Sequence, residues 1–198
     1  MAKIGLYFGS FNPVHIGHMA IAGYMTEFAG IDQVWFIVSP HNPLKKKETL
    51  LADHHRLYMV RLAIGDSDKL KASDIEFKLS VPSYTIDTLT YLKEKYPKND
   101  FCLVMGDDNL YTLHKWKNAE ELVSKYPIYV YPRPDSGKPS SLLLDQLLSK
   151  ADIHQVNAPL MDISGTFIRG GIKNKKDMSY FLPAAVWKYI REMHFYEK

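Results

Sequence analysis

Apolar positions follow two alternating patterns along the chain, which predict strands separated by helices. Short, continuous apolar runs are typical of buried strands, whereas apolar residues repeated every three or four positions are typical of helices. We expect strands at 4–8, 34–38, 101–105, 128–131 and 153–156, with a looser extended stretch over 70–79. We expect helices over 16–28, 57–64, 84–96, 142–148 and 183–193, and shorter ones after Asn118 and Ser164.

This order of elements predicts an α/β fold with a mainly parallel sheet, flanked by helices, and a small helical part at the C-terminal end. The 198 residues, 46% of them hydrophobic, suit one domain with a buried core, although length alone also allows two small domains. The proline-rich stretch at 132–139 is loop-like and similar to a linker, but a strand and helix pattern resumes after it. We therefore expect a single domain over 1–198.

Charge and composition narrow the class of partner. A formal net charge of +3 fits anionic small molecules but is too weak to indicate nucleic acid. The single cysteine, Cys102, lies in an apolar run, so we expect a core residue rather than a nucleophile, and no disulfide within the chain. The beginning of the chain is unlike a signal peptide, and no stretch approaches the ~20 apolar residues that span a bilayer. We expect a cytoplasmic protein without a membrane partner.

The most informative stretch is GSFNPVHIGH at 9–18, between the first expected strand and the first helix. Ligands bind at such a junction in open α/β sheets, and a helix N-terminus presents N–H groups to phosphates. His15 and His18, three positions apart, can share a face and stabilise charge on a reacting phosphate. Gly9 and Gly17 leave room for a nucleotide close to the backbone.

Other interpretations of this stretch stay open. It has neither the Lys-Ser/Thr ending of a P-loop nor the G-x-G-x-x-G spacing of a dinucleotide fingerprint. The two histidines could instead be a helix cap, a core pair or part of a zinc site. Zinc needs further ligands, for which His41, His54 and His55 are the nearest candidates.

The same stretch resembles the H-x-G-H signature of the nucleotidyltransferase superfamily, in the form G-[ST]-F-[DN]-P-x-H-x-G-H. Its members transfer a nucleotidyl group from a triphosphate and release pyrophosphate; class I aminoacyl-tRNA synthetases share a related signature. The resemblance implies a Rossmann-like, doubly wound sheet. It also implies that His15 and His18 contact the phosphates, with His18 at the α-phosphate. Roles in nucleotide binding or transfer follow for the rest of the signature, namely Gly9, Ser10, Phe11 and Gly17.

Two further segments resemble the nicotinate mononucleotide adenylyltransferase branch of this superfamily. The loop PHNPLKKK at 40–47 is similar to a proline-rich loop that ends in a phosphate-binding lysine, which implies Lys45, Lys46 or Lys47. PSYTIDTL at 82–89 is similar to P-S-Y-T-x-D-T, where a helix N-terminus and the threonine contact the pyridine carboxylate. This implies Tyr84 and Thr85 as acceptor-binding residues, while Ser83 could simply cap the helix.

Two more segments extend the resemblance over nearly the whole chain. MGDDN at 105–109 is similar to a G-x-D turn that contacts the nucleotide sugars, which implies Gly106 and Asp108, and the following Lys-Trp pair implies that Trp116 stacks on the nicotinate ring. DISGTFIR at 162–169 is similar to I-S-S-T-x-I-R, with Gly165 in place of the second serine. The residues that it assigns to the triphosphate are Ser164, Thr166 and Arg169. Arg133 matches a basic residue near the phosphates, although a surface arginine is an alternative.

The resemblance implies direct in-line transfer of AMP from ATP to nicotinate mononucleotide, with Mg²⁺ carried by the triphosphate and no protein cage for the metal. A pantetheine-phosphate adenylyltransferase is the nearest rival, and the segments at 82–89 and 115–116 argue against it. A class I synthetase fragment would need a K-M-S-K-S-like loop that the chain lacks. A non-catalytic nucleotide-binding regulator is a third alternative, against which the intact His15, His18 and Arg169 argue. The sequence leaves open whether the acceptor carries nicotinate or nicotinamide, although the region of Tyr84 and Thr85 favours the acid form. It also leaves the oligomeric state open, including a homo-oligomer.

Overall fold

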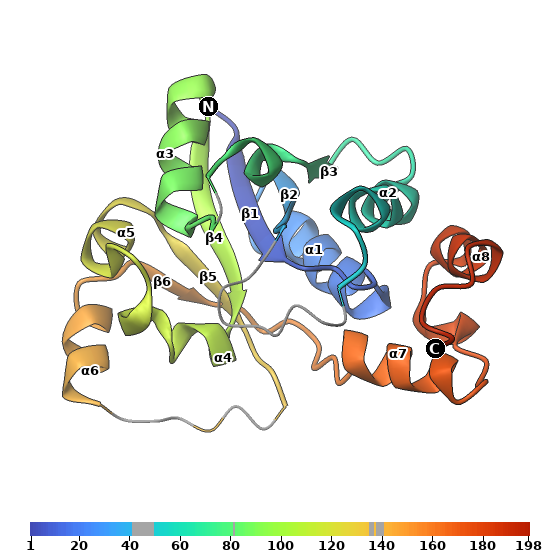
Figure 1. Ribbon diagram of the computed structural model, residues 1–198. Coiled ribbons are helices and arrows are strands. Elements are labelled where there is room, and N and C mark those ends of the chain that lie inside the picture. The colour runs from blue at the N-terminus through green and yellow to red at the C-terminus, as the bar shows by residue number, and fades with distance from the viewer. Residues whose placement is uncertain (41–49, 81, 135–136, 138–140) are drawn as a thin grey trace.

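A six-stranded parallel sheet forms the centre of the computed structural model, which describes residues 1–40, 50–80, 82–134, 137 and 141–198 (Figure 1). The strands lie in the order β3-β2-β1-β4-β5-β6, and all five neighbouring pairs are parallel. Their bounds are β1 (Lys3–Gly9), β2 (Gln33–Val38), β3 (Leu70–Ser73), β4 (Asp100–Gly106), β5 (Ile128–Tyr131) and β6 (Ile153–Gln155). The chain winds outward in both directions from the β1–β4 pair, which confirms the doubly wound, Rossmann-like fold.

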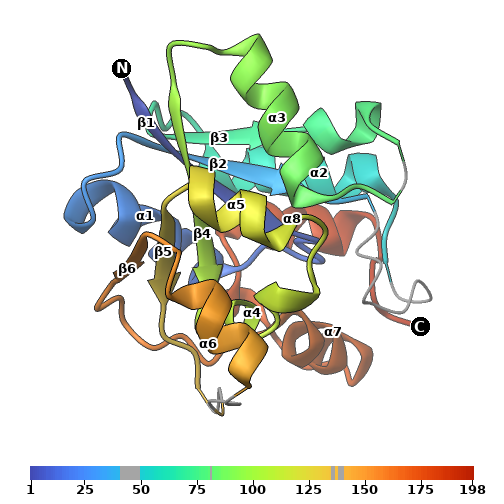
Figure 2. The ribbon, with the colours of Figure 1, turned by 90° about the vertical axis from the view of Figure 1, so that its left-hand side faces the viewer.

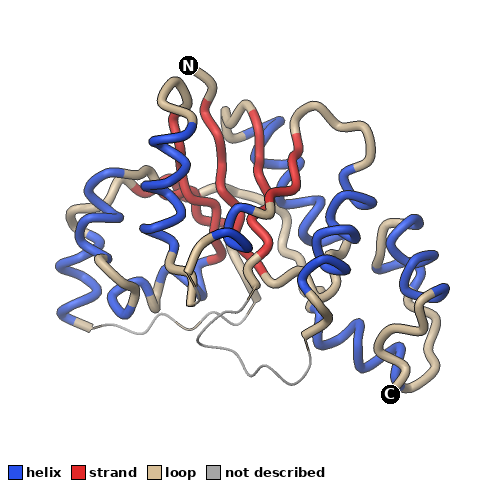
Figure 3. The backbone as a smooth tube through the Cα atoms, turned by 45° about the horizontal axis from the view of Figure 1, so that its top comes forward, coloured by secondary structure: helices blue, strands red, loops and turns tan. Residues whose placement is uncertain are grey.

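Helices cover both faces of this sheet (Figures 2 and 3). One face packs against α1 (Ile16–Phe28), α2 (Asp53–Ile64), α7 (Gly165–Lys173) and α8 (Ala184–Glu192). The other packs against α3 (Thr85–Lys95), α5 (Ala119–Lys125) and α6 (Leu142–Leu148). Four short elements complete the described chain, namely α4 (Asp107–Leu110) and the 3-10 helices η2 (Ile75–Lys78), η3 (Leu113–Lys115) and η4 (Ser179–Phe181). None of the helices in the described ranges is long and apolar enough to cross a bilayer.

Alternation along the strands separates two hydrophobic cores. On β1, Leu6 faces the core with α3 and α5, and Tyr7 faces the core with α1 and α2; Leu103 and Val104 repeat this division on β4. Both faces of a parallel sheet are covered, so the strands are continuously apolar rather than alternately polar. Cys102 belongs to the core with α1 and α2, here called the first core; the core with α3 and α5 is the second. Burial raises the pKa of the Cys102 thiol to about 12, which confirms a packing residue.

Two local expectations need correction. The stretch expected to be extended over 70–79 contains β3 and then the 3-10 turn η2. Ser83 does not cap α3, because the N-cap residue is Tyr84 and the Ser83 hydroxyl donates a hydrogen bond to Glu76 Oε2 at 3.0 Å. Glu76 is itself buried, which raises its pKa, and it also accepts a hydrogen bond from Thr88. Ser83 therefore ties the start of α3 to η2.

Candidate active site

The β1–α1 junction, residues 9–18, leaves the sheet at the carboxyl end of β1, beside the point where the strand order reverses. Phe11 anchors it: its backbone has φ of 45°, and its ring is buried against Tyr7 and Phe36. A Cβ on Gly9 would lie 2.9 Å from the Phe11 ring, and a Cβ on Gly17 would lie 3.1 Å from the His15 ring. The space beside both glycines is therefore filled by side chains of the junction itself. Phe11 acts as the buried anchor of this turn.

The two signature histidines lie face to face. The rings of His15 and His18 stack with their centres 3.7 Å apart and their planes at 28°. The backbone N–H of His15, the residue that precedes α1, donates to Nδ1 of His18 at 3.2 Å. Because Nδ1 accepts this bond, a neutral His18 carries its proton on Nε2, where it can be donated to an oxygen.

His15 is uncharged at neutral pH. It is only 5% exposed, and burial, with the charge of Arg133 as a further cause, lowers its pKa from 6.5 to about 4. Its Nδ1 atom is buried without a hydrogen-bond partner among the described residues. An unpaired buried polar atom is uncommon in a native fold, so this ring nitrogen marks the junction as unusual.

Arg133 lies close enough to this pair to act on it. It follows β5, where its N–H donates to Asp107 Oδ1 at 3.2 Å and its Nε lies 3.9 Å from Asp108 Oδ1. A Cβ on Gly106 would collide with the Asp108 carboxylate and the Arg133 side chain. The structure thus gathers Gly106, Asp108 and Arg133 at the carboxyl ends of β4 and β5, next to the junction.

The start of α7 reaches the junction from the far end of the chain. Arg169 donates to the carbonyl oxygen of Asn12 at 2.7 Å and to the hydroxyl of Thr166 at 3.3 Å. Ser164 caps α7 by accepting from the N–H of Phe167 at 3.1 Å. A Cβ at Gly165 would lie 2.9 Å from the Asn12 oxygen and 3.0 Å from Arg169, which explains glycine in place of serine. Glycine at position 165 therefore leaves room for the bond between Arg169 and Asn12.

The segments assigned to the acceptor lie on the other face of the sheet. Tyr84 and Trp116 both pack at the edge of the second core, and Thr85 is the first residue of α3. Lys117 joins the two segments, because its Nζ lies 4.7 Å from the Tyr84 ring centre and bonds Asp87 at 2.9 Å. Trp116 also lines a cavity of about 850 Å³, whose apolar lining includes Leu143 and Leu147. The structure therefore brings Tyr84, Thr85 and Trp116 into one region.

One residue that holds the site was missed from the sequence. Arg56 of α2 is fully buried and donates to the carbonyl oxygens of Ser10 at 2.6 Å, Ser39 at 2.8 Å, Leu51 at 2.9 Å and Pro40 at 3.2 Å. It also pairs with Asp53. A signal was present, because Arg56 and Val60 are four positions apart and share the buried face of a helix. Lys45 and Lys46 lie outside the described residues.

A zinc site at the junction gains no support. Among the described residues, no group of three His, Cys, Asp or Glu side chains could hold a metal ion. His54 and His55 instead contact each other, and His55 Nδ1 shares a 2.8 Å hydrogen bond with the Tyr189 hydroxyl of α8. His41 lies outside the described residues.

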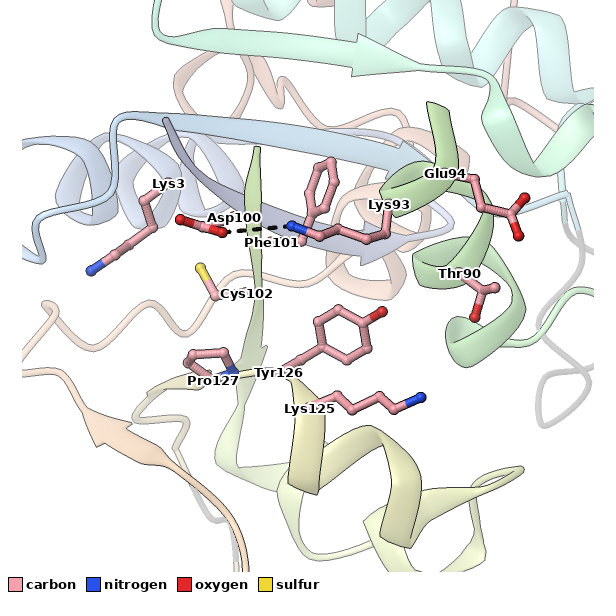
Figure 4. A pocket seen from close by; sticks show the side chains of 10 residues that line it. All are labelled: Lys3, Thr90, Lys93, Glu94, Asp100, Phe101, Cys102, Lys125, Tyr126 and Pro127. Carbon is pink, nitrogen blue, oxygen red and sulfur yellow. Dashed lines mark ion pairs between the residues drawn. The ribbon is translucent and has the colours of Figure 1, made fainter. Parts of the chain in front are cut away.

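A second cavity, of about 700 Å³, opens at the opposite end of the sheet (Figure 4). Its lining includes Lys3 and Asp100, at the amino ends of β1 and β4, and Lys125 at the end of α5. The ion pair between Lys93 and Asp100, 3.6 Å long, crosses it. Because ligands of doubly wound sheets bind at the carboxyl ends of the strands, this cavity is not the expected substrate site.

Comparisons with known proteins agree with this geometry. A family model described as cytidylyltransferase-like matches residues 6–171. Probable nicotinate-nucleotide adenylyltransferases of Flavobacterium psychrophilum and Flavobacterium johnsoniae are 54% and 55% identical over 196 residues, which is 99% of this chain and 100% of theirs. The structure of Plasmodium falciparum nicotinic acid mononucleotide adenylyltransferase complexed with NaAD shares the fold, with a TM-score of 0.80, 21% identity, and coverage of 100% of this chain and 98% of that one. The chain belongs to the nicotinate-nucleotide adenylyltransferase family of cytidylyltransferase-like proteins.

Proposed function

We propose that this protein transfers AMP from ATP to nicotinate mononucleotide, giving nicotinate adenine dinucleotide and pyrophosphate, and that the β1–α1 junction carries out the transfer. Family membership supports the reaction. The observation that carries the proposed site is the stacked pair of His15 and His18 at the start of α1, in the junction that Arg169 contacts at Asn12. Neutral imidazole N–H groups, backbone amides at a helix start and a guanidinium form a suitable grip for a triphosphate.

The reaction is a direct displacement at phosphorus. An oxygen of the 5′-phosphate of nicotinate mononucleotide attacks the α-phosphorus of ATP and forms the new P–O bond. The bond from the α-phosphorus to the oxygen that bridges to the β-phosphate breaks, and pyrophosphate leaves with its electron pair. The attacking phosphate is already anionic, so the protein supplies position and charge stabilisation rather than a nucleophile.

The donor half of the site would use the residues of the junction and of α7. His18 would donate from Nε2 to an oxygen of the α-phosphate, with His15 and Ser10 beside it. Arg169 would pair with the β- and γ-phosphates, and Arg133 would add positive charge at the same end of the sheet. The hydroxyls of Ser164 and Thr166 and the lysines Lys45 and Lys46 complete the set proposed for the triphosphate. Mg²⁺ bound to the phosphates of ATP would neutralise part of their charge.

The acceptor half would use the start of α3. The N–H groups at Tyr84 and Thr85 favour an anionic ring substituent, which suits nicotinate better than the neutral amide of nicotinamide. Trp116 offers a flat ring for stacking. Gly106, the last residue of β4, and Asp108, in α4 directly after it, are proposed to contact the nucleotide sugars.

The proposal also treats residues 1–198 as one domain, because each core draws on both halves of the sheet. Calorimetry should then show one unfolding transition, whereas two separated transitions would contradict a single domain. A cytoplasmic location remains part of this proposal and is consistent with a substrate such as ATP.

Pyrophosphate release tests the proposed reaction. The protein is incubated with ATP and Mg²⁺ and, separately, with nicotinate mononucleotide, nicotinamide mononucleotide or phosphopantetheine. We expect the fastest release with the nicotinate form and formation of nicotinate adenine dinucleotide. Release only with phosphopantetheine would overturn the acceptor, and tight ATP binding without turnover of any acceptor would favour a regulator.

A further inference from the structure

The segment that follows α8, residues 193–198, ends beside α7 (Figure 1), and its Tyr196 reaches the β1–α1 junction. There the hydroxyl of Tyr196 donates to Oδ1 of Asn12 at 2.7 Å, across a separation of 184 positions. Asn12 lies between Phe11, which anchors the junction, and the residues that lead to His15. A single hydroxyl therefore joins this segment to the proposed phosphate-binding turn.

Asn12 is the point where three remote segments meet the junction. It is only 5% exposed, its carbonyl oxygen accepts from Arg169, and its Oδ1 accepts from the N–H of Leu51 at 3.3 Å as well as from Tyr196. Leu51 is in turn held by Arg56, which donates to its carbonyl oxygen. These bonds converge on one buried side chain and its backbone from different sides. Loss of one donor therefore leaves the position of Asn12 less fixed, even though the other donors remain.

The backbone around Tyr196 is strained in a way that aims the side chain. His194 has φ of 53° and Tyr196 has φ of 66°, the left-handed region that residues with a Cβ rarely adopt. Such a conformation persists only where its surroundings hold it. Phe195, between the two, packs its ring on those of His55 and Tyr189, with centres 4.8 Å and 5.7 Å apart. Burial raises the pKa of Tyr196, so its hydroxyl keeps the proton that it donates.

We propose that Tyr196 is a positioning residue for adenylyl transfer, which acts through its hydrogen bond to Asn12 and does not touch the substrates. This inference rests on the proposed function of the junction. Through Asn12, the Tyr196 hydroxyl would hold His15 and His18 where they meet the α-phosphate. In-line transfer is sensitive to such placement, because small displacements of a catalytic group reduce the rate far more than they reduce folding.

The first test replaces Tyr196 by phenylalanine, which removes the hydroxyl and keeps the ring. We expect kcat to fall about fivefold to tenfold, the change that loss of one buried hydrogen bond and its alignment implies. KM for nicotinate mononucleotide should stay within about twofold, since the acceptor residues lie on the other face of the sheet. The matched control is Tyr189→Phe, which removes a hydroxyl bonded to His55 in the same aromatic cluster. That control should retain wild-type kcat.

A double-mutant cycle tests whether the effect passes through Asn12. In an Asn12→Leu background, which has no side-chain acceptor, adding Tyr196→Phe should change kcat by less than about twofold. An equal fivefold to tenfold loss in both backgrounds would overturn the inference. A second pair of variants, both at Asn12, tests the inference even if Tyr196→Phe fails to fold. Asn12→Asp keeps an acceptor and should have a kcat at least about fivefold higher than that of Asn12→Leu. Equal kcat values would overturn the inference.

The outcomes separate this inference from the proposed function. If the wild-type protein releases no pyrophosphate with nicotinate mononucleotide, the proposed function fails. If the wild-type protein is active and folded Tyr196→Phe matches it in kcat, only the positioning role fails. A fall in kcat of the same size in Tyr189→Phe would also overturn that role, because it would trace the loss to the aromatic cluster rather than to Asn12.

Discussion

The two ends of the parallel sheet differ in how their polar groups are held, although both carry positive charge. At the carboxyl end, His15, Asn12 and Arg56 are buried, and Asn12 and Arg56 are bonded to distant segments, such as Leu51 and Ser10. At the amino end, a cavity of about 700 Å³ is lined by exposed lysines, of which Lys93 and Lys125 pair with nearby acids. A hollow with lysines is therefore not enough to mark a site. Buried polar groups fixed by the backbone are the stronger sign, because they are stable only where the fold or a ligand satisfies them.

The largest expected effect in this comparison is on catalysis. Replacing His18 by alanine removes the N–H donor proposed for the α-phosphate, and we expect kcat to fall about 10²- to 10³-fold, as for loss of one oxyanion donor. Initial rates of pyrophosphate release at saturating ATP measure the change. Full activity in a folded His18→Ala protein would contradict the assigned role.

The next effect is on stability. In Arg56→Lys, a single ammonium group replaces the planar guanidinium and cannot bond four carbonyl oxygens from three segments. Some of these buried acceptors then lose their partners. We expect the free energy of unfolding to fall by about 3 kcal/mol, with a loss of kcat because Ser10 is no longer held. Urea denaturation gives the first value. The matched control is Arg61→Lys, an exposed arginine of the same helix, which should change stability by less than about 0.5 kcal/mol.

A smaller effect should appear as a pH dependence. The unfolded chain binds a proton on His15 near pH 6.5, whereas the folded protein holds the pKa at about 4, so acid favours the unfolded state in this window. Stability from this residue is full above pH 6.5 and is lost between pH 6.5 and 4, by at most about 3 kcal/mol. Urea midpoints across this range should fall less steeply for His15→Gln than for the wild type. Parallel curves for the two proteins would refute a buried neutral His15.

The smallest effect is expected at the amino end. Lys93→Met removes an exposed ion pair with Asp100 and a 2.8 Å bond to the Asn99 carbonyl. Exposed pairs contribute about 0–1 kcal/mol, so stability should fall by no more than that and kcat should stay the same. A loss of activity comparable to that of His18→Ala would erase the contrast between the two ends.

The pattern of apolar residues was sufficient for the sheet and its helices, because continuous apolar runs and periods of three to four are local properties of the chain. The juxtaposition of the 9–18 stretch with Arg169 and Arg133 followed from resemblance. The bonds of Arg56 to Ser10 and of Tyr196 to Asn12 were not found, since they cross 46 and 184 positions. The helical spacing of Arg56 and Val60 indicates that Arg56 is buried but not what it binds. The contact between Gly9 and the Phe11 ring was not found either, because Phe11 adopts a left-handed backbone that no sequence pattern reveals.

The junction is closed by bonds that cross 157 positions, from Arg169, and 184 positions, from Tyr196, whereas β1 pairs with β2 much nearer along the chain. Contacts with long closing loops form late in folding and are readily released in partial openings. A local opening that breaks these bonds would thus release Asn12 and lower activity while the sheet and its helices stay folded. On mild heating, activity should begin to fall below the single unfolding transition, before the circular dichroism changes.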